Sequence, residues 1–264
     1  MKKTMIWTTA MIFAVMAAAV PALSQTAGDH IKKGDDFYAQ HKDALALEEF
    51  LAAVKLEPGN YEALWKASRS LVDNGDLVET KVKGSAEKQK KFYQDAEAYA
   101  RKAVQANPND AMGHFSLSAA LGKHALLLGK KDQIAMSKEV RSEIEKTLEL
   151  DPNNDGAYHA FGRWHRRMAE IGGAKRLIGG LLYGSIPKGS MEDSEKYLRK
   201  AVELKPNYLN HRLELGRTLV AVEKYGAAAA EFQKCIDLPS ETSKDAGYKN
   251  EAQIELGAIQ KKLR

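Results

Sequence analysis

The chain has 264 residues, of which 40 are lysine or arginine and 35 are aspartate or glutamate, so its formal net charge is +5. Such a mild excess of positive charge argues against a nucleic-acid partner, because dedicated nucleic-acid-binding proteins usually carry a strongly basic stripe. The single cysteine, Cys235, excludes an internal disulfide. The length is sufficient for one sizeable core or for an extended array of repeats.

The chain begins with a segment that has the layout of a secretory leader. Two lysines precede an apolar run over residues 5–20, and the small residues Ala22 and Ser24 follow. This layout predicts a signal peptide over residues 1–24 with cleavage before Gln25, and therefore a protein exported to the periplasm or secreted. The alternative is that the run is kept as an N-terminal membrane anchor, although it is shorter than the roughly 20 residues that span a bilayer.

From residue 27 onwards the chain repeats one pattern, in which two amphipathic helical segments are followed by a proline that stops the second one. These stops are Pro58, Pro108, Pro152 and Pro206. Small and aromatic residues recur around them at the spacings of the 34-residue tetratricopeptide template, as Gly34 and Phe50 do in the first unit and Gly216 and Phe232 in the last. The pattern predicts an all-α fold, a tetratricopeptide-like right-handed superhelix of helical hairpins over residues 25–264.

The predicted elements are five helix pairs and a closing helix. The repeats are expected at residues 27–60, 61–110, 111–154, 155–208 and 209–241. The helices are expected, in chain order, at 29–40 and 44–56, 61–72 and 85–106, 111–128 and 132–150, 155–171 and 191–204, and 209–222 and 225–237. A capping helix at 245–263 would cover the last pair, as terminal repeats require for solubility. No segment predicts a strand or a second domain.

The three middle units are longer than the template. Successive prolines are 50, 44 and 54 residues apart, which exceeds the 34-residue repeat by 16, 10 and 20. In each unit the extra residues fall between the small residue of the first helix and that of the second. All three insertions are therefore predicted to project from one edge of the superhelix, and insertions on one face often mark a binding face.

Two rows of first-helix positions are predicted to line the concave groove of the superhelix. The seventh and the eleventh residues after the successive prolines are Trp65, Phe115, His159 and Leu213, and Arg69, Ala119, Arg163 and Arg217. One row is mainly apolar and the other is mainly arginine, whose planar set of donors suits a carboxylate or a phosphate. Such a groove would hold an acidic peptide or an amphiphile with an anionic head group. The alternative is that the arginines pair with helix acids and that the aromatic residues pack between hairpins.

The longest insertion, residues 169–190, combines two Gly-Gly pairs with an apolar stretch. Its sequence, AEIGGAKRLIGGLLYGSIPKGS, predicts a short helix with a basic end and an apolar face, flanked by glycine hinges. It is predicted to be a lid over an apolar pocket or a contact with a membrane surface, and the alternative is a static plug on the core. The residues assigned to the lid or membrane contact are Lys175, Arg176, Leu177, Ile178, Leu181 and Leu182.

From about residue 108 to residue 263 the chain resembles the regulator of microtubule dynamics family. The residues that carry the resemblance are Gly162, Trp164, Ala169, Glu170 and Pro187. The resemblance implies a tetratricopeptide-like fold. Members of that family include proteins that are tethered to membranes and bind microtubules, and at least one whose repeat domain carries phospholipid. The resemblance therefore implies a microtubule or phospholipid partner.

No motif of catalytic or metal-binding chemistry accompanies these features. His159 and His165 are six residues apart, so they lie about 120° apart on a helix surface, and no zinc motif, phosphate-binding loop or nucleophile elbow occurs. The sequence therefore predicts a protein that is not an enzyme and holds no cofactor or metal. The predicted function is a scaffold that binds a protein or peptide in its groove. The alternatives are a carrier of phospholipid or another hydrophobic ligand, with residues 169–190 as its lid, and a microtubule-associated role implied by the resemblance.

Overall fold

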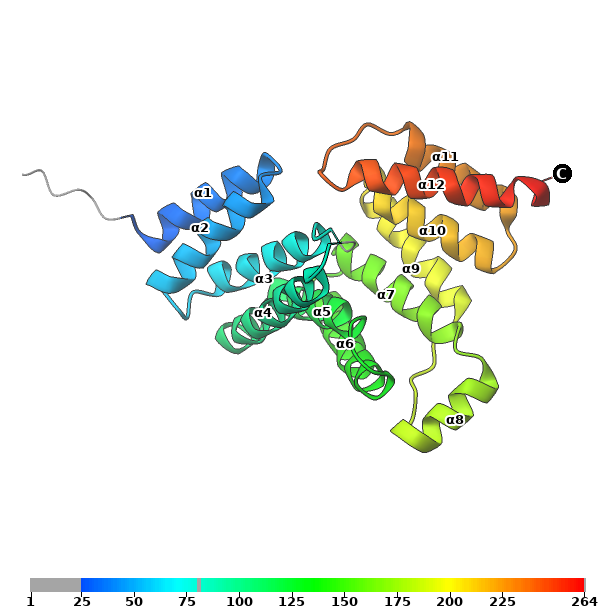
Figure 1. Ribbon diagram of the computed structural model, residues 1–264, viewed down its shortest axis with the longest axis horizontal. Helices are drawn as coiled ribbons and strands as arrows, with labels where there is room; N and C mark the ends of the chain where they lie inside the picture. The colour runs from blue at the N-terminus through cyan, green and yellow to red at the C-terminus, as the bar shows by residue number, and fades with distance from the viewer. Residues whose placement is uncertain (1–24, 80–81, 264) are drawn as a thin grey trace, which may run out of the picture.

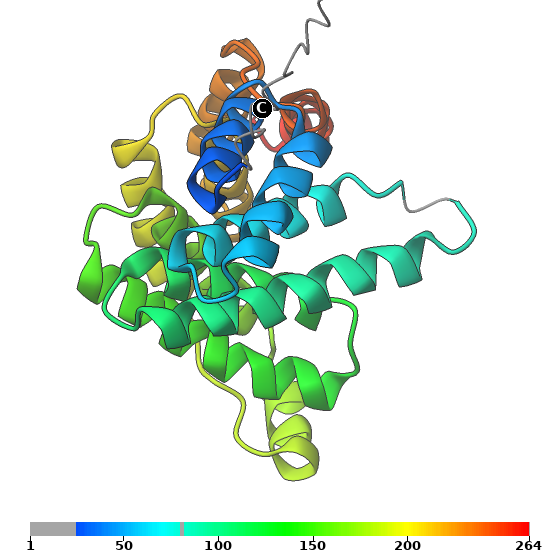
Figure 2. The same cartoon turned by 90° about the vertical axis from the view of Figure 1, so that its left-hand side faces the viewer.

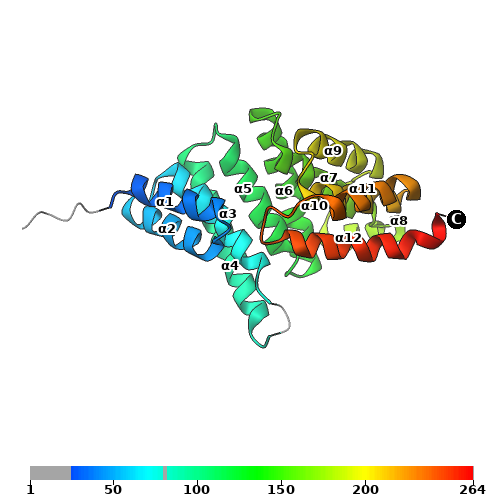
Figure 3. The same ribbon diagram turned by 90° about the horizontal axis from the view of Figure 1, so that it is seen from above.

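The computed structural model describes residues 25–79 and 82–263, and this part of the chain contains helices and no strand. The helices are α1 (Ala27–Ala39), α2 (Asp43–Leu56), α3 (Tyr61–Asp76), α4 (Ser85–Ala106), α5 (Ala111–Ala125), α6 (Lys130–Leu150), α7 (Asp155–Ala169), α8 (Gly173–Tyr183), α9 (Met191–Leu204), α10 (Leu209–Ala221), α11 (Tyr225–Asp237), α12 (Asp245–Ile259) and the 3-10 turn η1 (Gln260–Lys262). Figures 1 and 3 show the hairpins α1–α2, α3–α4, α5–α6, α7–α9 and α10–α11 following one another along a curved path. The predicted all-α hairpin superhelix is confirmed.

Each hairpin begins where the sequence stops one helix and caps the next. The residues at the N-termini of α3, α5 and α7 are Asn60, Asp110 and Asn154, each two residues after a proline. Their side-chain oxygens accept hydrogen bonds of 2.9–3.0 Å from backbone amides two or three residues further on. Such a cap satisfies an amide that the first turn of a helix leaves without a partner. The proline and the cap together fix where one helix ends and the next begins.

The two helices of a pair approach closely where a glycine on the first faces a large side chain on the second. Gly34 of α1 lies against Phe50 of α2, and Gly216 of α10 lies against Phe232 of α11. A Cβ atom placed on Gly34 would lie 2.5 Å from Cε1 of Phe50, which is closer than real side chains approach. Both rings are fully buried, as is Cys235 of α11. The small positions therefore allow the two helices of a pair to approach, and Cys235 packs in the core.

The extra residues of the middle units are used in two ways. They lengthen α4 and α6 to 22 and 21 residues in the second and third pairs. In the fourth pair they form α8, while Gly162 and Leu198 keep the glycine-to-large contact between α7 and α9. Figure 2 shows the N-terminal end of α4 and the whole of α8 extending from the body in different directions, as expected where successive hairpins of a superhelix are rotated. That all three insertions project from one edge of the superhelix stays a prediction.

The closing helix α12 packs against both α10 and α11, as expected for a cap. Ala252 and Ile259 of α12 belong to the same buried core cluster as Leu213 and Leu219 of α10. Before α12, the chain turns back toward the N-terminal half, so that the start of α12 lies close to the end of α3 (Figure 1). Among the described residues, no helix is long and apolar enough to cross a bilayer.

Candidate functional site on the concave face

The first helices of consecutive hairpins contact one another along the concave side, where the apolar row was predicted. Trp65 and Phe115 are half-buried there, whereas His159 and Leu213 are buried. Phe115 packs on the backbone of Gly156 in α7, with its Cζ 2.5 Å from where a Cβ atom would stand. Leu213 is only 1 % exposed, so it belongs to the core and cannot line an open groove. The row therefore packs largely between hairpins.

Two of the three arginines of the predicted row surround one buried carboxylate. Glu214 of α10 is 3 % exposed, with Arg217 Nη1 3.0 Å from Oε1 and Arg163 Nε 3.6 Å from Oε2. A third arginine, Arg166, donates to Oε2 and also to the backbone carbonyl of Glu214. Burial alone would raise the pKa of Glu214, but Arg163 and Arg166 outweigh it and hold the pKa at about 2. Glu214 is therefore charged and is the centre of a buried ionic cluster.

The closing helix supplies the other partners of Arg217. Glu251 of α12 accepts a hydrogen bond of 2.7 Å from Nη2, and Glu255 accepts one of 3.0 Å from Nε. Arg163 and Arg217 are therefore half-buried and neutralised within the chain, and they do not offer a free charge to the groove. Here the arginines are paired with helix acids.

A second ionic cluster joins residues that are far apart in the sequence. Lys244, just before α12, lies 2.6 Å from Asp73 and 3.2 Å from Asp76 at the end of α3. Lys123 of α5 also pairs with Asp76, at 2.6 Å. Burial would lower the pKa of Lys244, but the two aspartates outweigh this effect and raise it. The segment before α12 is therefore held against α3 on the concave side.

Arg69 is the remaining arginine of the predicted row, and it is held by rings rather than by acids. Its guanidinium lies 3.7 Å from the ring centre of Tyr38 and 5.0 Å from that of Trp65. Among the described residues it has no ion pair, and its buried Nε has no hydrogen-bond partner. We call Tyr38, Trp65 and Arg69 the Arg69 platform. Cation–π contacts therefore fix the plane of this guanidinium.

Two buried histidines face each other between α7 and α10. Their Nδ1 atoms, in His159 and His211, are 3.0 Å apart, and His211 Nε2 lies 2.8 Å from Asp155 Oδ2. Burial lowers the pKa of both rings. The pair needs one nitrogen as donor and one as acceptor, so at least one ring is neutral.

This histidine pair predicts a loss of stability in mild acid. Because the folded-state pKa values lie below the ordinary 6.5, the unfolded chain binds protons first, and the free energy of unfolding falls as pH drops below about 6.5. Urea melts at several pH values should show this fall, and the His159→Gln/His211→Gln variant should flatten it. The exposed His41 provides the control, since His41→Gln should leave the pH profile unchanged. An unaltered profile in the double variant would contradict the assignment.

The predicted lid residues lie on α8, apart from the concave site. Leu177, Ile178, Leu181 and Leu182 are 59–81 % exposed, and Lys175 is exposed as well. Arg176 differs from them, because its guanidinium donates to the backbone carbonyls of residues 168, 171, 186 and 187 and so joins the two ends of the insertion. Beyond its own connections, α8 contacts α6. A plug would bury these apolar side chains, which the structure leaves exposed.

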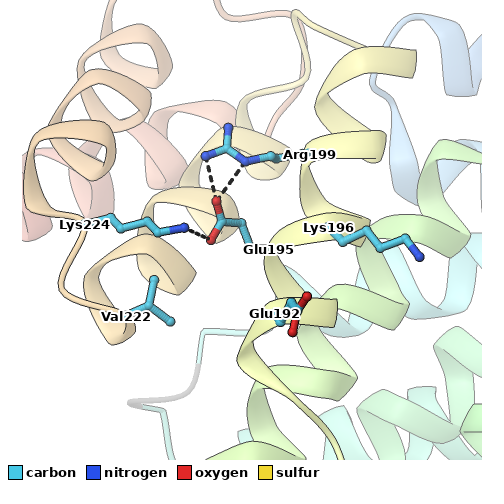
Figure 4. A pocket seen from close by; sticks show the side chains of 6 residues that line it. All are labelled: Glu192, Glu195, Lys196, Arg199, Val222 and Lys224. Carbon is cyan, nitrogen blue, oxygen red and sulfur yellow. Dashed lines mark hydrogen bonds and ion pairs between the residues drawn. The ribbon is translucent and has the colours of Figure 1, made fainter.

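Two surface depressions are lined by residues outside α8. One is between α9 and the start of α11, where Glu195 pairs with Arg199 and Lys224, each at 2.8 Å (Figure 4). The other follows the α3–α4 connection and includes Leu77 and Phe92. The first is lined by solvated ion pairs, which contribute little to stability. Neither depression is bordered by a residue of α8, so neither supports the prediction of a lid.

Most of this chain matches one family of known proteins. Residues 30–260 match the family described as regulator of microtubule dynamics protein 1-3. Regulator of microtubule dynamics protein 1 of Bos taurus is 27 % identical over 219 residues, which cover 82 % of this chain and 67 % of the bovine protein. The human protein of the same name is 28 % identical over 189 residues, covering 71 % of this chain and 59 % of its own length.

Solved structures show the same fold. A tetratricopeptide-repeat protein of Thermus thermophilus superposes with a TM-score of 0.61 at 16 % identity, covering 88 % of this chain and 99 % of the thermophilic one. At that identity the likeness concerns the fold alone.

The relatives correct the predicted location. The sequence predicted export to the periplasm or outside the cell, with an N-terminal anchor as the alternative. The matching animal proteins are named for the regulation of microtubules, filaments of the cell interior that an exported protein does not meet, so that prediction is wrong. The predicted location rested on the basic start and the apolar run of residues 5–20. The segment itself, residues 1–24, lies outside the described residues.

Proposed function

We propose that this chain, which belongs to the regulator of microtubule dynamics family, is a non-enzymatic scaffold that binds an acidic segment of a partner protein in its concave groove. The Arg69 platform is the anchor of that segment. The observation that carries the proposal is the half-buried guanidinium of Arg69, which is stacked on Tyr38 and has no acid of its own among the described residues.

An arginine that is stacked on aromatic rings is well suited to bind a carboxylate. Stacking on a ring fixes the plane of the guanidinium, so less conformational freedom is lost when a carboxylate binds. A partly desolvated site also strengthens the charge-assisted hydrogen bonds that form. Arg163 and Arg217, by contrast, already have Glu214 and the acids of α12 as partners. The N-terminal half of the groove is therefore the part that offers an unfilled charge.

Binding of a fluorescent glutamate-rich peptide to the full-length chain tests this proposal. Loss of a charge-assisted pair of hydrogen bonds costs about 1.5–3 kcal/mol, so Arg69→Gln should weaken binding by about tenfold or more in an anisotropy titration. The matched control is Arg101→Gln. Arg101 lies on α4, where it pairs with Glu97 and Glu139 between the second helices of two hairpins. Equal affinities for the two variants would refute the Arg69 platform as the anchor.

The names of the relatives suggest the microtubule as a partner. Proteins that match 67 % or more of their own length to this chain are called regulators of microtubule dynamics. Microtubules are thus a second candidate for the groove partner. Co-sedimentation with polymerised tubulin should pellet the wild-type chain and the Arg101→Gln variant, and should leave Arg69→Gln in the supernatant. If all three remain soluble, the microtubule is not the partner.

A further inference from the structure

The helix α8 presents an apolar face that nothing in the described part of the chain covers. At about 100° per residue, Leu177, Leu181, Ile178 and Leu182 fall within an arc of roughly 140° on the helix surface. All four side chains are more than half exposed. Isolated exposed leucines are common on proteins, but four on one helix face form a contiguous patch, and such patches mark interaction sites.

The opposite face of α8 is fixed to its own connection. A Cβ atom on Gly179 would lie 2.8 Å from Cδ1 of Ile186, so the helix packs closely against the segment that follows it. Arg176 donates at 3.2 Å and 2.6 Å to the carbonyls of Ile186 and Pro187, and also to that of Met168. The two ends of the insertion are thereby held together, which sets the direction in which the apolar face points.

The position of α8 makes this face accessible to an extended surface. Figures 1 and 2 show α8 standing off from the hairpins, on the far side of α7 from α12. Gly184, with a φ of +85°, turns the chain back immediately after the helix, a conformation that residues with a side chain rarely adopt. The helix is therefore presented at the tip of a closed loop.

The charges around α8 indicate what would cover it. Between Ile171 and Met191 the sequence has no aspartate or glutamate, whereas Lys175 and Lys188 are both exposed. Helices that lie in the interface of an anionic bilayer have positive charge beside an apolar face, which they bury among the lipids. A second copy fits less well, because four side chains fall short of the roughly 800 Å² per partner that a stable dimer buries.

We propose that α8 docks the protein on the surface of an anionic phospholipid bilayer, with Leu177, Ile178, Leu181 and Leu182 among the acyl chains and Lys175 and Lys188 at the head groups. This role is separate from the binding of a partner in the groove. The helix is too short to span the membrane, so the contact is peripheral and reversible.

Vesicle flotation tests the proposal with the full-length chain. The wild type should float with phosphatidylcholine vesicles that contain about one third phosphatidylserine, and the Leu177→Ser/Leu181→Ser/Leu182→Ser variant should lose at least tenfold in bound fraction. Its thermal melt should stay at the wild-type value, because the three side chains are exposed. The control is Leu56→Ser/Leu77→Ser/Ile254→Ser, which changes three exposed apolar residues elsewhere and should float normally.

The charge component is tested separately. Lys175→Gln/Lys188→Gln should weaken flotation with the anionic vesicles several-fold and leave the melt unchanged, and added salt should have a similar effect on the wild type. Arg69→Gln should float as the wild type does, which distinguishes this role from the proposed groove function. Absence of flotation by the wild type, or normal flotation by the leucine variant, would overturn the proposal. A dimer that the leucine variant loses, without vesicle binding, would assign the face to a second copy instead.

Discussion

Glu214→Gln should lower the free energy of unfolding by about 3–5 kcal/mol, since it leaves buried positive charges without their counter-charge. Arg166 is the most affected. Its guanidinium donates to Glu214, and its one other acid among the described residues is the more distant and exposed Glu170, 3.9 Å away. Arg163 also loses its acid partner, whereas Arg217 keeps Glu251 and Glu255. Urea denaturation at pH 7 measures the difference, which is a large part of the stability of an ordinary domain.

The matched control is Glu145→Gln, which breaks an exposed ion pair. Arg141 Nε lies 2.8 Å from Glu145, and both side chains are nearly half exposed, so the expected change is at most about 1 kcal/mol. A second readout separates the charge of Glu214 from its shape. Because its folded-state pKa is about 2 and its ordinary value is 4.5, its stabilising effect is complete above pH 4.5 and is lost as pH falls toward 2. The deficit of Glu214→Gln should shrink over that range. A deficit that is equal at all pH values would exclude the ionic explanation.

The sequence is sufficient to predict the hairpins because their signals are local. Each proline stops a helix by itself, and Asn60, Asp110 and Asn154 cap the next helix through amides two or three residues away. The glycine-to-ring contact of Gly34 and Phe50 spans only 16 residues. Helix ends are less well defined, as α5 shows by ending at Ala125 where the pattern continues to residue 128.

The concave site could be predicted only in part, because its partners come from distant segments. Counting from the prolines picks out Arg163 and Arg217 but not their partners, because Glu214 is three residues before Arg217 and looks in the sequence like an ordinary surface pair. Lys244 contacts residues that precede it by 168 and 171 positions, and no local pattern records such a contact. The same limit explains why Leu213 is buried although it was predicted to line the groove. The closing helix α12 covers the last repeat, and Leu213 shares a core cluster with Ala252 of that helix.

Residues 169–190 show where a pattern predicts conformation but not role. The sequence predicts a short helix with an apolar face, and α8 is such a helix. Whether that face would be buried depended on contacts that the sequence does not encode locally. Arg176 illustrates this point, because a cation assigned to the surface instead joins both ends of the insertion through backbone carbonyls. Gly184 is a second example, because the positive φ at this position favours glycine, and the sequence alone does not show that angle.

Gly216→Ala should destabilise the protein, although the same substitution in most helices is favourable. Alanine exceeds glycine by about 1 kcal/mol in helix propensity, so Gly122→Ala on α5, where a Cβ atom would meet nothing within 4 Å, should be neutral or stabilising. At Gly216 the new methyl group would overlap the ring of Phe232, which is fully buried. The helices must then separate, at a cost of about 1–3 kcal/mol that outweighs the gain in propensity. Gly216→Leu should cost more.

A double-mutant cycle connects this cost to the contact. If the overlap with the ring is the cause, Phe232→Leu should cost less stability in the Gly216→Ala background than in the wild type, because the smaller side chain relieves the clash. The cycle is measured by urea denaturation of the four proteins. Additive changes would mean that Gly216 acts through the backbone rather than through Phe232. A coupled result would show that the close approach of α10 and α11, on which the positions of Arg217 and Glu214 depend, is set by one missing methyl group.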